Sequence, residues 1–263
     1  MKNTNEKRRR PAPAAPVEEI EGQLEGRNAL TEALRSGRTV DKVFIAAGEI
    51  DRGLQRLAAE AKDAGAVVVP VDRRKLDAMS TTHSHQGVIA LVAAHEYASI
   101  DDILEEAASR GETALIVICD ELSDPHNLGA IMRSAECAGA HGVIIPKRRS
   151  VGLTATVAKA SAGAVEYMKV ARVTNINQAI AELKEKGVWI FGTAAEGSIP
   201  MYKADLTGPT AIVIGNEGQG MSPLVRKNCD VTVHIPMKGR ISSLNASAAA
   251  SILLYEAVRQ RLG

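Results

Sequence analysis

The stretch "ALIVICDEL" at residues 114–122 decides the fold class of this chain, because an uninterrupted apolar run leads directly into an acidic pair. A strand with one wet face alternates apolar and polar residues, whereas a continuous run is typical of a strand covered on both faces. Such strands belong to parallel sheets, whose neighbouring strands are joined by crossover helices. The stretch therefore predicts a buried strand of an α/β domain.

The chain after this stretch alternates between helical and strand patterns, as a mainly parallel sheet requires. Helical spacing is found at residues 127–140, 154–164, 176–187, 222–229 and from about Asn245 to Leu262. Short runs typical of strands lie at 141–146, 166–173, 188–195, 210–217 and 231–237. Ligands bind open sheets of this type at the carboxyl ends of the strands, which is where the polar motifs of this chain lie.

A smaller alternating unit precedes the large domain. Residues 26–36, 54–65 and 73–79 have helical spacing, and residues 40–47, 66–72 and 87–94 are typical of strands. We therefore divide the chain into a tail at 1–21, an α/β unit at 22–96, a linker at 97–112 and a large domain at 113–263. Ser99 is expected to cap a helix in the linker, two residues before Asp101 and Asp102. The basic, proline-rich tail is expected to be extended and solvated.

The composition is that of an ordinary soluble globular protein, with 263 residues, 45% hydrophobic residues and a formal net charge of +1. No apolar run approaches the roughly 20 residues that a membrane helix requires, and the first residues lack the apolar core of a signal peptide. We expect a cytoplasmic protein with no membrane partner. The cysteines form no C-x-x-C pair and His83 and His85 have no acidic or cysteine cluster beside them, so no metal site is expected.

The first polar motif is "DELSDPHNLGAIMRSAECAGA" at residues 120–140. Pro125 discourages helix before it, so Asn127 is expected to cap the following helix, and Gly129 allows close approach in its first turn. Arg133 lies six positions further on, so it can converge with Asn127 only if Asn127 belongs to the loop. A simple capped helix with a solvated arginine explains this stretch equally well.

The second motif is "AIVIGNEGQGMSP" at residues 211–223, a buried strand that enters a glycine-rich loop. Its spacing matches neither the dinucleotide fingerprint nor a phosphate loop, which argues against nicotinamide or ATP phosphate binding. The loop exposes backbone amides and one acidic side chain, Glu217, although a tight turn with a solvated glutamate is the simpler alternative. Ser222 is expected to cap a helix that begins at Pro223.

The third motif is "HIPMKGRISSLNASAAAS" at residues 234–251. A basic turn at Lys238 and Arg240 follows a strand, and Ser242, Ser243 and Asn245 offer groups that could cap a helix or contact a ligand. The small residues behind them suit a helix in a crowded interior or a subunit contact. An ordinary cap followed by good helix formers is the alternative.

These three motifs, in this order and spacing, resemble the signature motifs of the SpoU/TrmH family of RNA ribose 2′-O-methyltransferases. The resembling segments are "NLGAIMR" at 127–133, "IGNEGQGM" at 214–221 and "IPMKGRISSLNASAAA" at 235–250. In addition, "EGRNAL" at 25–30 and "HQGVIA" at 85–90 resemble the amino-terminal substrate domain of bacterial enzymes that methylate a guanosine of large-subunit ribosomal RNA. The resemblance covers nearly all of residues 22–263.

The resemblance implies a parallel-sheet domain whose carboxy-terminal segment forms a deep trefoil knot, preceded by a small α/β substrate-binding domain that resembles a ribosomal protein. It implies that the cofactor is S-adenosylmethionine, that the partner is RNA, with 23S rRNA the expected substrate, and that the chain forms a homodimer through the knotted domain. DNA is not an expected partner, because the target is a 2′-hydroxyl. The implied cofactor-binding residues are Thr193, Ala194, Gly215, Ile235 and Leu244. The implied catalytic residues are Asn127, Arg133, Glu217, Ser243 and Asn245.

Arginine keeps its proton far above neutral pH, so Arg133 is expected to bind the phosphate beside the target ribose and to stabilise developing alkoxide. Glu217 would orient Arg133, and Asn245 would bind the ribose. The group that accepts the proton of the 2′-hydroxyl is not identified. Three alternatives remain: methylation of a tRNA guanosine, methylation of an rRNA adenosine as in resistance enzymes, and a non-catalytic RNA-binding assembly factor.

Overall fold

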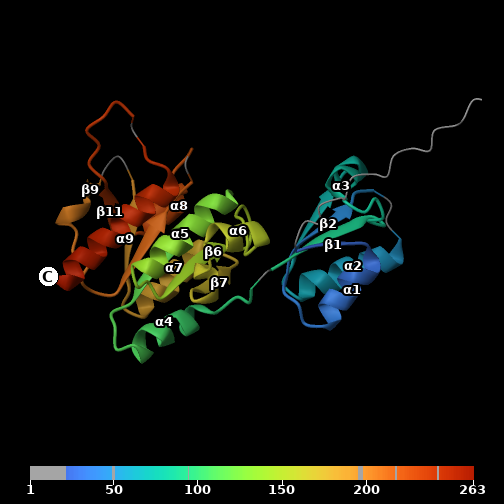
Figure 1. Cartoon of the computed structure of the whole chain (residues 1–263), viewed down its shortest axis with the longest axis horizontal. Helices are drawn as coiled ribbons and strands as arrows, with labels where there is room; N and C mark the ends of the chain where they lie inside the picture. The colour runs from blue at the N-terminus through green and yellow to red at the C-terminus, as the bar shows by residue number, and fades with distance from the viewer. Residues whose placement is uncertain (1–21, 49–50, 94, 195–197, 217, 242) are drawn as a thin grey trace, which may run out of the picture.

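The computed structural model describes residues 22–48, 51–93, 95–194, 198–216, 218–241 and 243–263, which form two α/β units that are joined near residue 97 (Figure 1). Each unit has its own sheet, with strand order β1-β4-β2-β3 in the N-terminal unit and β7-β6-β5-β10-β8-β11-β9 in the C-terminal one. No helix in these ranges is both long and apolar enough to cross a bilayer. The tail expected at 1–21 lies outside the described residues.

The N-terminal unit contains a mixed sheet. Its strands are β1 (Gln23–Glu25), β2 (Val40–Ala46), β3 (Val67–Val71) and β4 (Val88–Val92). Its helices are α1 (Arg27–Arg35), α2 (Arg52–Asp63) and α3 (Arg73–Met79). β2 pairs with β3 in parallel, whereas β4 runs antiparallel to both β1 and β2. Strand β1 was not predicted, because three residues are too few to show a strand period.

Helices α1 and α2 cover one face of this sheet and build the main core of the unit, in which Leu30, Val43 and Leu54 are buried. Helices α2 and α3 begin after aspartate caps, whereas Gly26 before α1 offers no capping side chain. Asp51 Oδ1 accepts a hydrogen bond from Leu54 N at 2.9 Å, and Asp72 Oδ1 accepts one from Arg74 N at 2.9 Å.

Segment 97–112, expected as a linker, carries helix α4 (Ile100–Ser109). Ser99 caps this helix as predicted, and Asp102 completes a reciprocal capping box. Ile103 of α4 is fully buried against the C-terminal sheet, where a Cβ on Gly142 would lie 2.5 Å from the Ile103 side chain. The helix is therefore packed onto the second unit.

The C-terminal sheet is parallel in every pairing among the described strands. Its strands are β5 (Leu115–Cys119), β6 (Gly142–Pro146), β7 (Lys169–Val173), β8 (Trp189–Thr193), β9 (Ile199–Pro200), β10 (Thr210–Ile214) and β11 (Val231–His234). All five residues of β5 are buried, which confirms the prediction from the apolar run at 114–122.

Helices cover both faces of this sheet. They are α5 (Pro125–Cys137), α6 (Ala155–Ala160), α7 (Ile176–Glu185), α8 (Pro223–Asn228) and α9 (Ala246–Leu262), with 3-10 turns at Ala164–Glu166 and Met201–Lys203. One core lies between the sheet and α5, α6 and α9, and the other lies between the sheet and α4, α7 and α8. The α/β fold class is thus confirmed, and the deep trefoil knot stays a prediction.

A buried ion pair joins the two units. Arg172 of β7 donates from Nη1 to Asp41 Oδ1 of β2 at 2.6 Å, and the Tyr97 hydroxyl donates to Asp41 Oδ2 at 2.9 Å. Both charged side chains are only 7% exposed. Burial raises the pKa of Asp41, and Arg172 opposes that shift. Because desolvation offsets much of the attraction in such pairs, we expect this contact to fix geometry more than to add stability.

Candidate functional site

The predicted cofactor residues lie around one cavity at the carboxyl edge of the C-terminal sheet. Strand β8 lies between β10 and β11, so the carboxyl ends of these three parallel strands lie side by side. The cavity has a volume of about 830 Å³. Its lining includes all five residues expected to bind the cofactor and one expected in catalysis: Thr193, Ala194, Gly215, Ile235, Leu244 and Ser243.

The glycine loop after β10 closes tightly on itself. Asn216 and Gly220 exchange two backbone hydrogen bonds, of 3.0 and 2.8 Å. A Cβ on Gly215 would lie 2.2 Å from the carbonyl carbon of Gly220, so no larger residue fits there. The Asn216 side chain also donates to the Glu121 carbonyl at 3.2 Å, which ties this loop to the end of β5. Hydrogen bonds of the loop's own backbone and of the Asn216 side chain therefore fix its conformation beside the cavity.

The ends of the strands beside the cavity are also closely packed. Thr193 donates from Oγ1 to the Val213 carbonyl at 3.0 Å, which links the ends of β8 and β10. A Cβ on Gly192 would lie 2.6–2.9 Å from the sulfur-bearing ends of Cys229 and Met221. Asp120, at the end of β5, accepts a hydrogen bond from Ser222 N at 2.7 Å. Ser222 does occupy the N-cap of α8 as predicted, although its side chain makes no capping hydrogen bond.

The prediction that Asn127 caps the first-motif helix is wrong. Helix α5 begins at Pro125, and Asp124 is its cap, with Oδ1 accepting from His126 N at 2.9 Å. Proline suits the first helical position because its missing N–H would have no partner there. Asn127 is therefore inside the first turn, where it is 7% exposed.

Because α5 begins at Pro125, Asn127 and Arg133 both lie on this helix and point in different directions from it. At about 100° per residue, six positions place the two side chains roughly 120° apart around the helix. Asn127 is buried against the neighbouring elements, whereas Arg133 is exposed on the outer side of α5. The two side chains therefore do not converge within one chain.

Asn127 instead meets Asn245, so the first and third motifs are joined. Asn245 Nδ2 donates to Asn127 Oδ1 at 2.9 Å. The oxygen of Asn245 caps helix α9, accepting from Ser247 N at 3.0 Å and from Ala248 N at 3.3 Å. The capping alternative is therefore right for Asn245, and its amide donor also points at the first motif.

The small residues of α9 allow close packing against α5. Ala250 is fully buried, and the hydroxyls of Ser134 and Ser251 lie 2.7 Å apart. On the other side of α5, a Cβ on Gly129 would lie 2.5 Å from Ala160 Cβ. The crowded-interior interpretation of "ASAAAS" is thus right for Ala246 and Ala250, whereas Ala248 is exposed and the subunit-contact alternative stays a prediction.

Two polar residues of the cavity lining were not anticipated. Arg226 of α8 and His234 of β11 both line the cavity, and His234 Nδ1 lies 2.9 Å from Ser198 Oγ. His234 follows the same strand-end rule as the motifs and could have been found by it. Arg226 offered no signal, because it lies in a short helix whose placement depends on the tertiary fold.

Among the predicted catalytic residues, Ser243 lines the cavity, the Asn127–Asn245 pair lies between α5 and the start of α9, and Arg133 is on the surface. Glu217 lies outside the described residues. No group of three or more metal-ligating side chains occurs in the described ranges. His85 is instead buried in a hydrogen-bonded pair with Asp77, with Nε2 and Oδ1 2.9 Å apart.

Comparison with known proteins identifies two matching family models. The model described as the SpoU rRNA Methylase family matches residues 114–255, and the one described as RNA 2′-O ribose methyltransferase substrate binding matches residues 23–98. YacO of Bacillus subtilis (strain 168), assigned to the TrmH family of tRNA/rRNA methyltransferases, is 48% identical over 236 residues, covering 90% of this chain and 94% of that protein.

Solved structures share the architecture of the whole chain. The SpoU methyltransferase AviRb from Streptomyces viridochromogenes, in complex with AdoMet, is 28% identical with a TM-score of 0.59, covering 91% of this chain and 90% of that one. The AdoMet-bound rRNA methyltransferase from Sinorhizobium meliloti is 25% identical with a TM-score of 0.57, covering 92% and 88%.

Proposed function

Because the chain belongs to the SpoU/TrmH family of RNA methyltransferases, we propose that it transfers a methyl group from S-adenosylmethionine to the ribose 2′-hydroxyl of a guanosine in 23S rRNA. The observation that carries the proposal is the single cavity lined by all five residues expected to bind the cofactor. Its volume is in the range of 300–1,000 Å³ that is usual for small-molecule sites.

The lining chemistry fits the cofactor. Ile235, Leu244 and Leu253 offer apolar surface for an adenine ring, and the loop from Gly215 to Gly220 offers backbone groups for its polar edges. When bound, S-adenosylmethionine supplies a methyl group that its sulfonium has already activated. The remaining task of the protein is alignment, which can contribute roughly 7–11 kcal/mol in well-oriented reactions.

Asn245 and Asn127 would hold the ribose end of the substrate near Ser243. The Asn245 oxygen is engaged in the α9 cap, so its amide donor would leave Asn127 for the ribose when RNA binds. Arg133 would bind the adjacent phosphate as a permanent cation.

Arg133 can serve such a site only from a partner subunit, since it faces away from Asn127 of its own chain. We therefore include a homodimer formed through α5 and α9 in the proposal. Support comes from apolar side chains on the exposed side of α9, where Tyr255 is 51% and Ile252 37% exposed. A twofold arrangement is the commonest one among soluble homo-oligomers.

The proposal is tested by incubating the protein with S-adenosylmethionine labelled on the methyl group, together with purified 23S rRNA, 16S rRNA and tRNA. We expect label in 23S rRNA alone, at one guanosine whose 3′ linkage then resists alkaline hydrolysis. Label in tRNA or at an adenosine would contradict the proposed substrate and would identify the substrate instead. Cofactor binding without transfer to free RNA or to ribosomal particles would favour the assembly-factor alternative.

Asn245→Ser is the informative variant in this assay. Serine is a good cap, so α9 should keep its start, but the side chain is too short to reach Asn127 or a ribose. We expect the free energy of unfolding to fall by about 1 kcal/mol for the lost hydrogen bond to Asn127, with unchanged cofactor affinity and at least a hundredfold lower kcat. Wild-type turnover in this variant would remove Asn245 from the proposed active site.

A further inference from the structure

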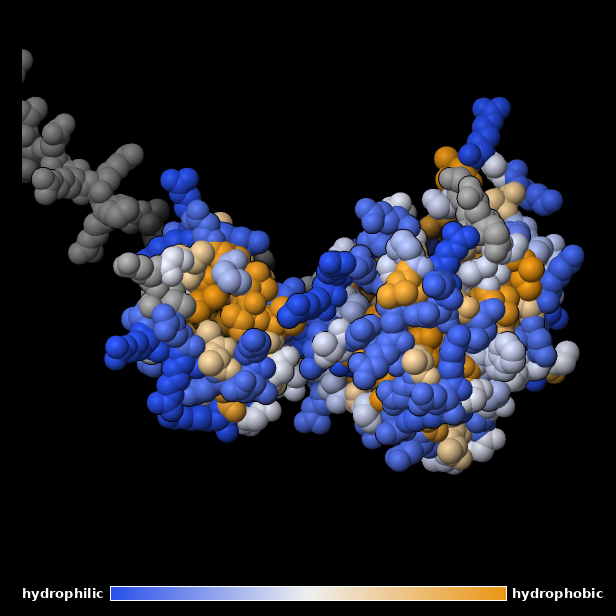
Figure 2. Space-filling model, turned by 180° about the vertical axis from the view of Figure 1, so that it is seen from behind, coloured by the Kyte–Doolittle hydropathy of each residue, from blue (hydrophilic) through white to orange (hydrophobic). Residues whose placement is uncertain are grey.

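One face of the N-terminal sheet is only partly covered, and the side chains in its middle are half-buried. Helices α1 and α2 pack on the opposite face, and only α3, a helix of seven residues, packs on this one. The core beneath α3 has three buried members, Val71, Leu76 and Ile89. Figure 2 shows that apolar side chains gather on the surface of this unit.

Phe44 lies in the middle of this face. It pairs with Val69 of β3 and with Ile89 of β4, and residues paired in this way project to the same side of a sheet. Phe44 and Val69 are only partly buried in the small cluster under α3. The face thus presents an aromatic ring beside aliphatic surface.

Two lysines flank the Phe44 ring. Lys42 Nζ lies 5.9 Å from the ring centroid and Lys75 Nζ lies 5.8 Å from it. Lys42 projects to the same side because it is two residues before Phe44 in β2, and Lys75 is carried by α3. Each contact is within the distance of a cation–π interaction.

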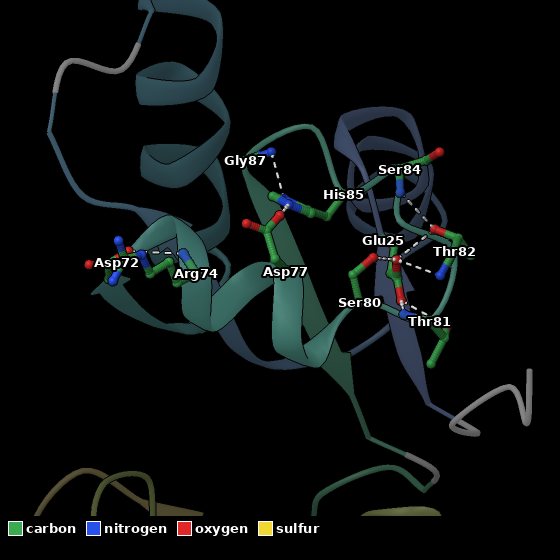
Figure 3. Close-up of polar contacts among 10 residues, drawn as sticks. All are labelled: Glu25, Asp72, Arg74, Asp77, Ser80, Thr81, Thr82, Ser84, His85 and Gly87. Carbon is green, nitrogen blue, oxygen red and sulfur yellow. Dashed lines mark hydrogen bonds and ion pairs between the residues drawn. The ribbon is translucent and has the colours of Figure 1, made fainter.

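Helix α3 is held in place at both ends, so Lys75 is presented from a fixed element. Figure 3 shows the capping contact of Asp72 at one end and, at the other, the carboxylate of Glu25 surrounded by the residues that follow α3. Glu25 accepts hydrogen bonds from Thr81 N at 2.6 Å and from Thr82 Oγ1 at 2.6 Å.

The acidic groups nearest this face are already engaged. Asp77 of α3 bonds to His85, as Figure 3 shows, and the carboxylate of Glu25 is occupied by Ser80, Thr81 and Thr82. The residues of β2, β3 and β4 that project to the side of Phe44 include no Asp or Glu: they are Lys42, Ala46, Val67, Val69, Val71, Ile89 and Leu91. The face therefore combines apolar surface with the positive charge of Lys42 and Lys75.

We propose that this face binds an unpaired nucleotide of the substrate RNA, with the base stacked on Phe44 and the flanking phosphates contacted by Lys42 and Lys75. Bases present an apolar π-face and are joined by phosphates, so they match an aromatic ring with two ammonium groups nearby. The inference rests on the proposed function in one respect, that the substrate is RNA.

The test uses the full-length protein and two fluorescein-labelled probes, an unstructured 12-nucleotide RNA and a 12-base-pair RNA duplex, with affinity measured by anisotropy. Phe44→Leu keeps an apolar side chain but removes the ring, and Phe44→Tyr keeps the ring. We expect Phe44→Leu to weaken single-strand binding roughly 5- to 150-fold with little effect on the duplex, and Phe44→Tyr to bind as wild type.

The lysines are tested through the salt dependence of the same binding. For the double variant Lys42→Gln/Lys75→Gln, we expect the slope of log affinity against log salt to fall by roughly 1.4 for the single strand, about 0.7 for each phosphate that a lysine no longer neutralises. The matched control is Arg56→Gln/Lys62→Gln on α2, which covers the opposite face, and its slope should match that of wild type.

Equal reductions in affinity for single strand and duplex in Phe44→Leu, or an unchanged slope in the lysine variant, would overturn the inference. So would a change of oligomeric state in Phe44→Leu with unchanged RNA affinity, since the face would then be an interface between copies. Failure of methyl transfer with Phe44-dependent RNA binding intact would count against the proposed function alone. Cofactor affinity, measured by calorimetry, should be the same in all variants.

Discussion

At the scale of single residues, the site depends on positions where neighbouring backbone leaves no room for a side chain. Gly215 is the clearest case, because the loop returns on itself directly above its Cα. The family resemblance implied that Gly215 is a cofactor-binding residue. The structure gives a more specific reason, which is contact between Gly215 and the backbone of Gly220.

We predict that Gly215→Ala displaces the 216–220 loop and weakens binding of S-adenosylmethionine by more than tenfold. The physical reason is a contact of 2.2 Å that only a backbone movement can relieve. Gly208→Ala is the control, because a Cβ there meets nothing within 4 Å. Equal calorimetric affinities in the two variants would show that the loop takes no part in holding the cofactor.

At the scale of elements, motif chemistry predicted which segments form helices better than where each begins. The predicted caps at Ser99 and Ser222 were right, since each comes directly before its first helical residue. The start of α5 was misplaced because Asp124 and Asn127 are both good capping residues, and proline at the first position decided between them. Local sequence preference therefore favoured two start positions for α5 almost equally.

The turn after α3 is organised by one carboxylate and should make the N-terminal unit sensitive to acid. Burial by itself would raise the pKa of Glu25, but hydrogen bonds from Ser80, Thr82 and Thr81 outweigh it and hold the pKa far below its ordinary value of 4.5. A carboxyl with a lowered folded-state pKa stabilises the fold above its unfolded-state pKa. That stabilisation is lost as the pH falls below about 4.5.

We predict that Glu25→Gln lowers the free energy of unfolding of this unit by about 2 kcal/mol at pH 7, the usual contribution of a hydrogen bond to a charged group. The difference from wild type should shrink between pH 5 and pH 3, where Glu25 loses its advantage as a charged acceptor. Urea unfolding followed at several pH values measures this, with exposed Glu32→Gln as the control. A difference that stays constant down to pH 3 would contradict it.

At the scale of the whole molecule, the contact between the two units depends on Arg172 and Asp41, which are 131 positions apart. Neither residue belongs to a motif, and neither stood out in the sequence as a partner for the other. The Tyr97 hydroxyl bonds to both units, because it donates to Asp41 Oδ2 and accepts from Leu153 N at 2.9 Å. This cluster joins the unit that carries the proposed RNA-binding face to the unit that carries the cavity.

We predict that Arg172→Ala releases the N-terminal unit, because an unpaired buried carboxylate costs about 3–5 kcal/mol. Small-angle scattering should give a larger radius of gyration, and the KM for RNA should rise while cofactor affinity is unchanged. The pair Asp41→Leu/Arg172→Met is the control, since replacing both charges is often close to neutral. A single-variant radius equal to wild type would show that the units are held by other contacts.

The sequence by itself determined the α/β class, the buried strand at 114–122, the alternation of elements and the motifs, because these depend on residue patterns within a few turns of the chain. The tertiary structure alone decided that β8 lies between β10 and β11, that Asn127 bonds to Asn245 and faces away from Arg133, and that Asp41 meets Arg172. Strand order and long-range pairing follow from how crossovers pack on a common sheet, and a local pattern of residues carries no record of which distant segment will be its neighbour.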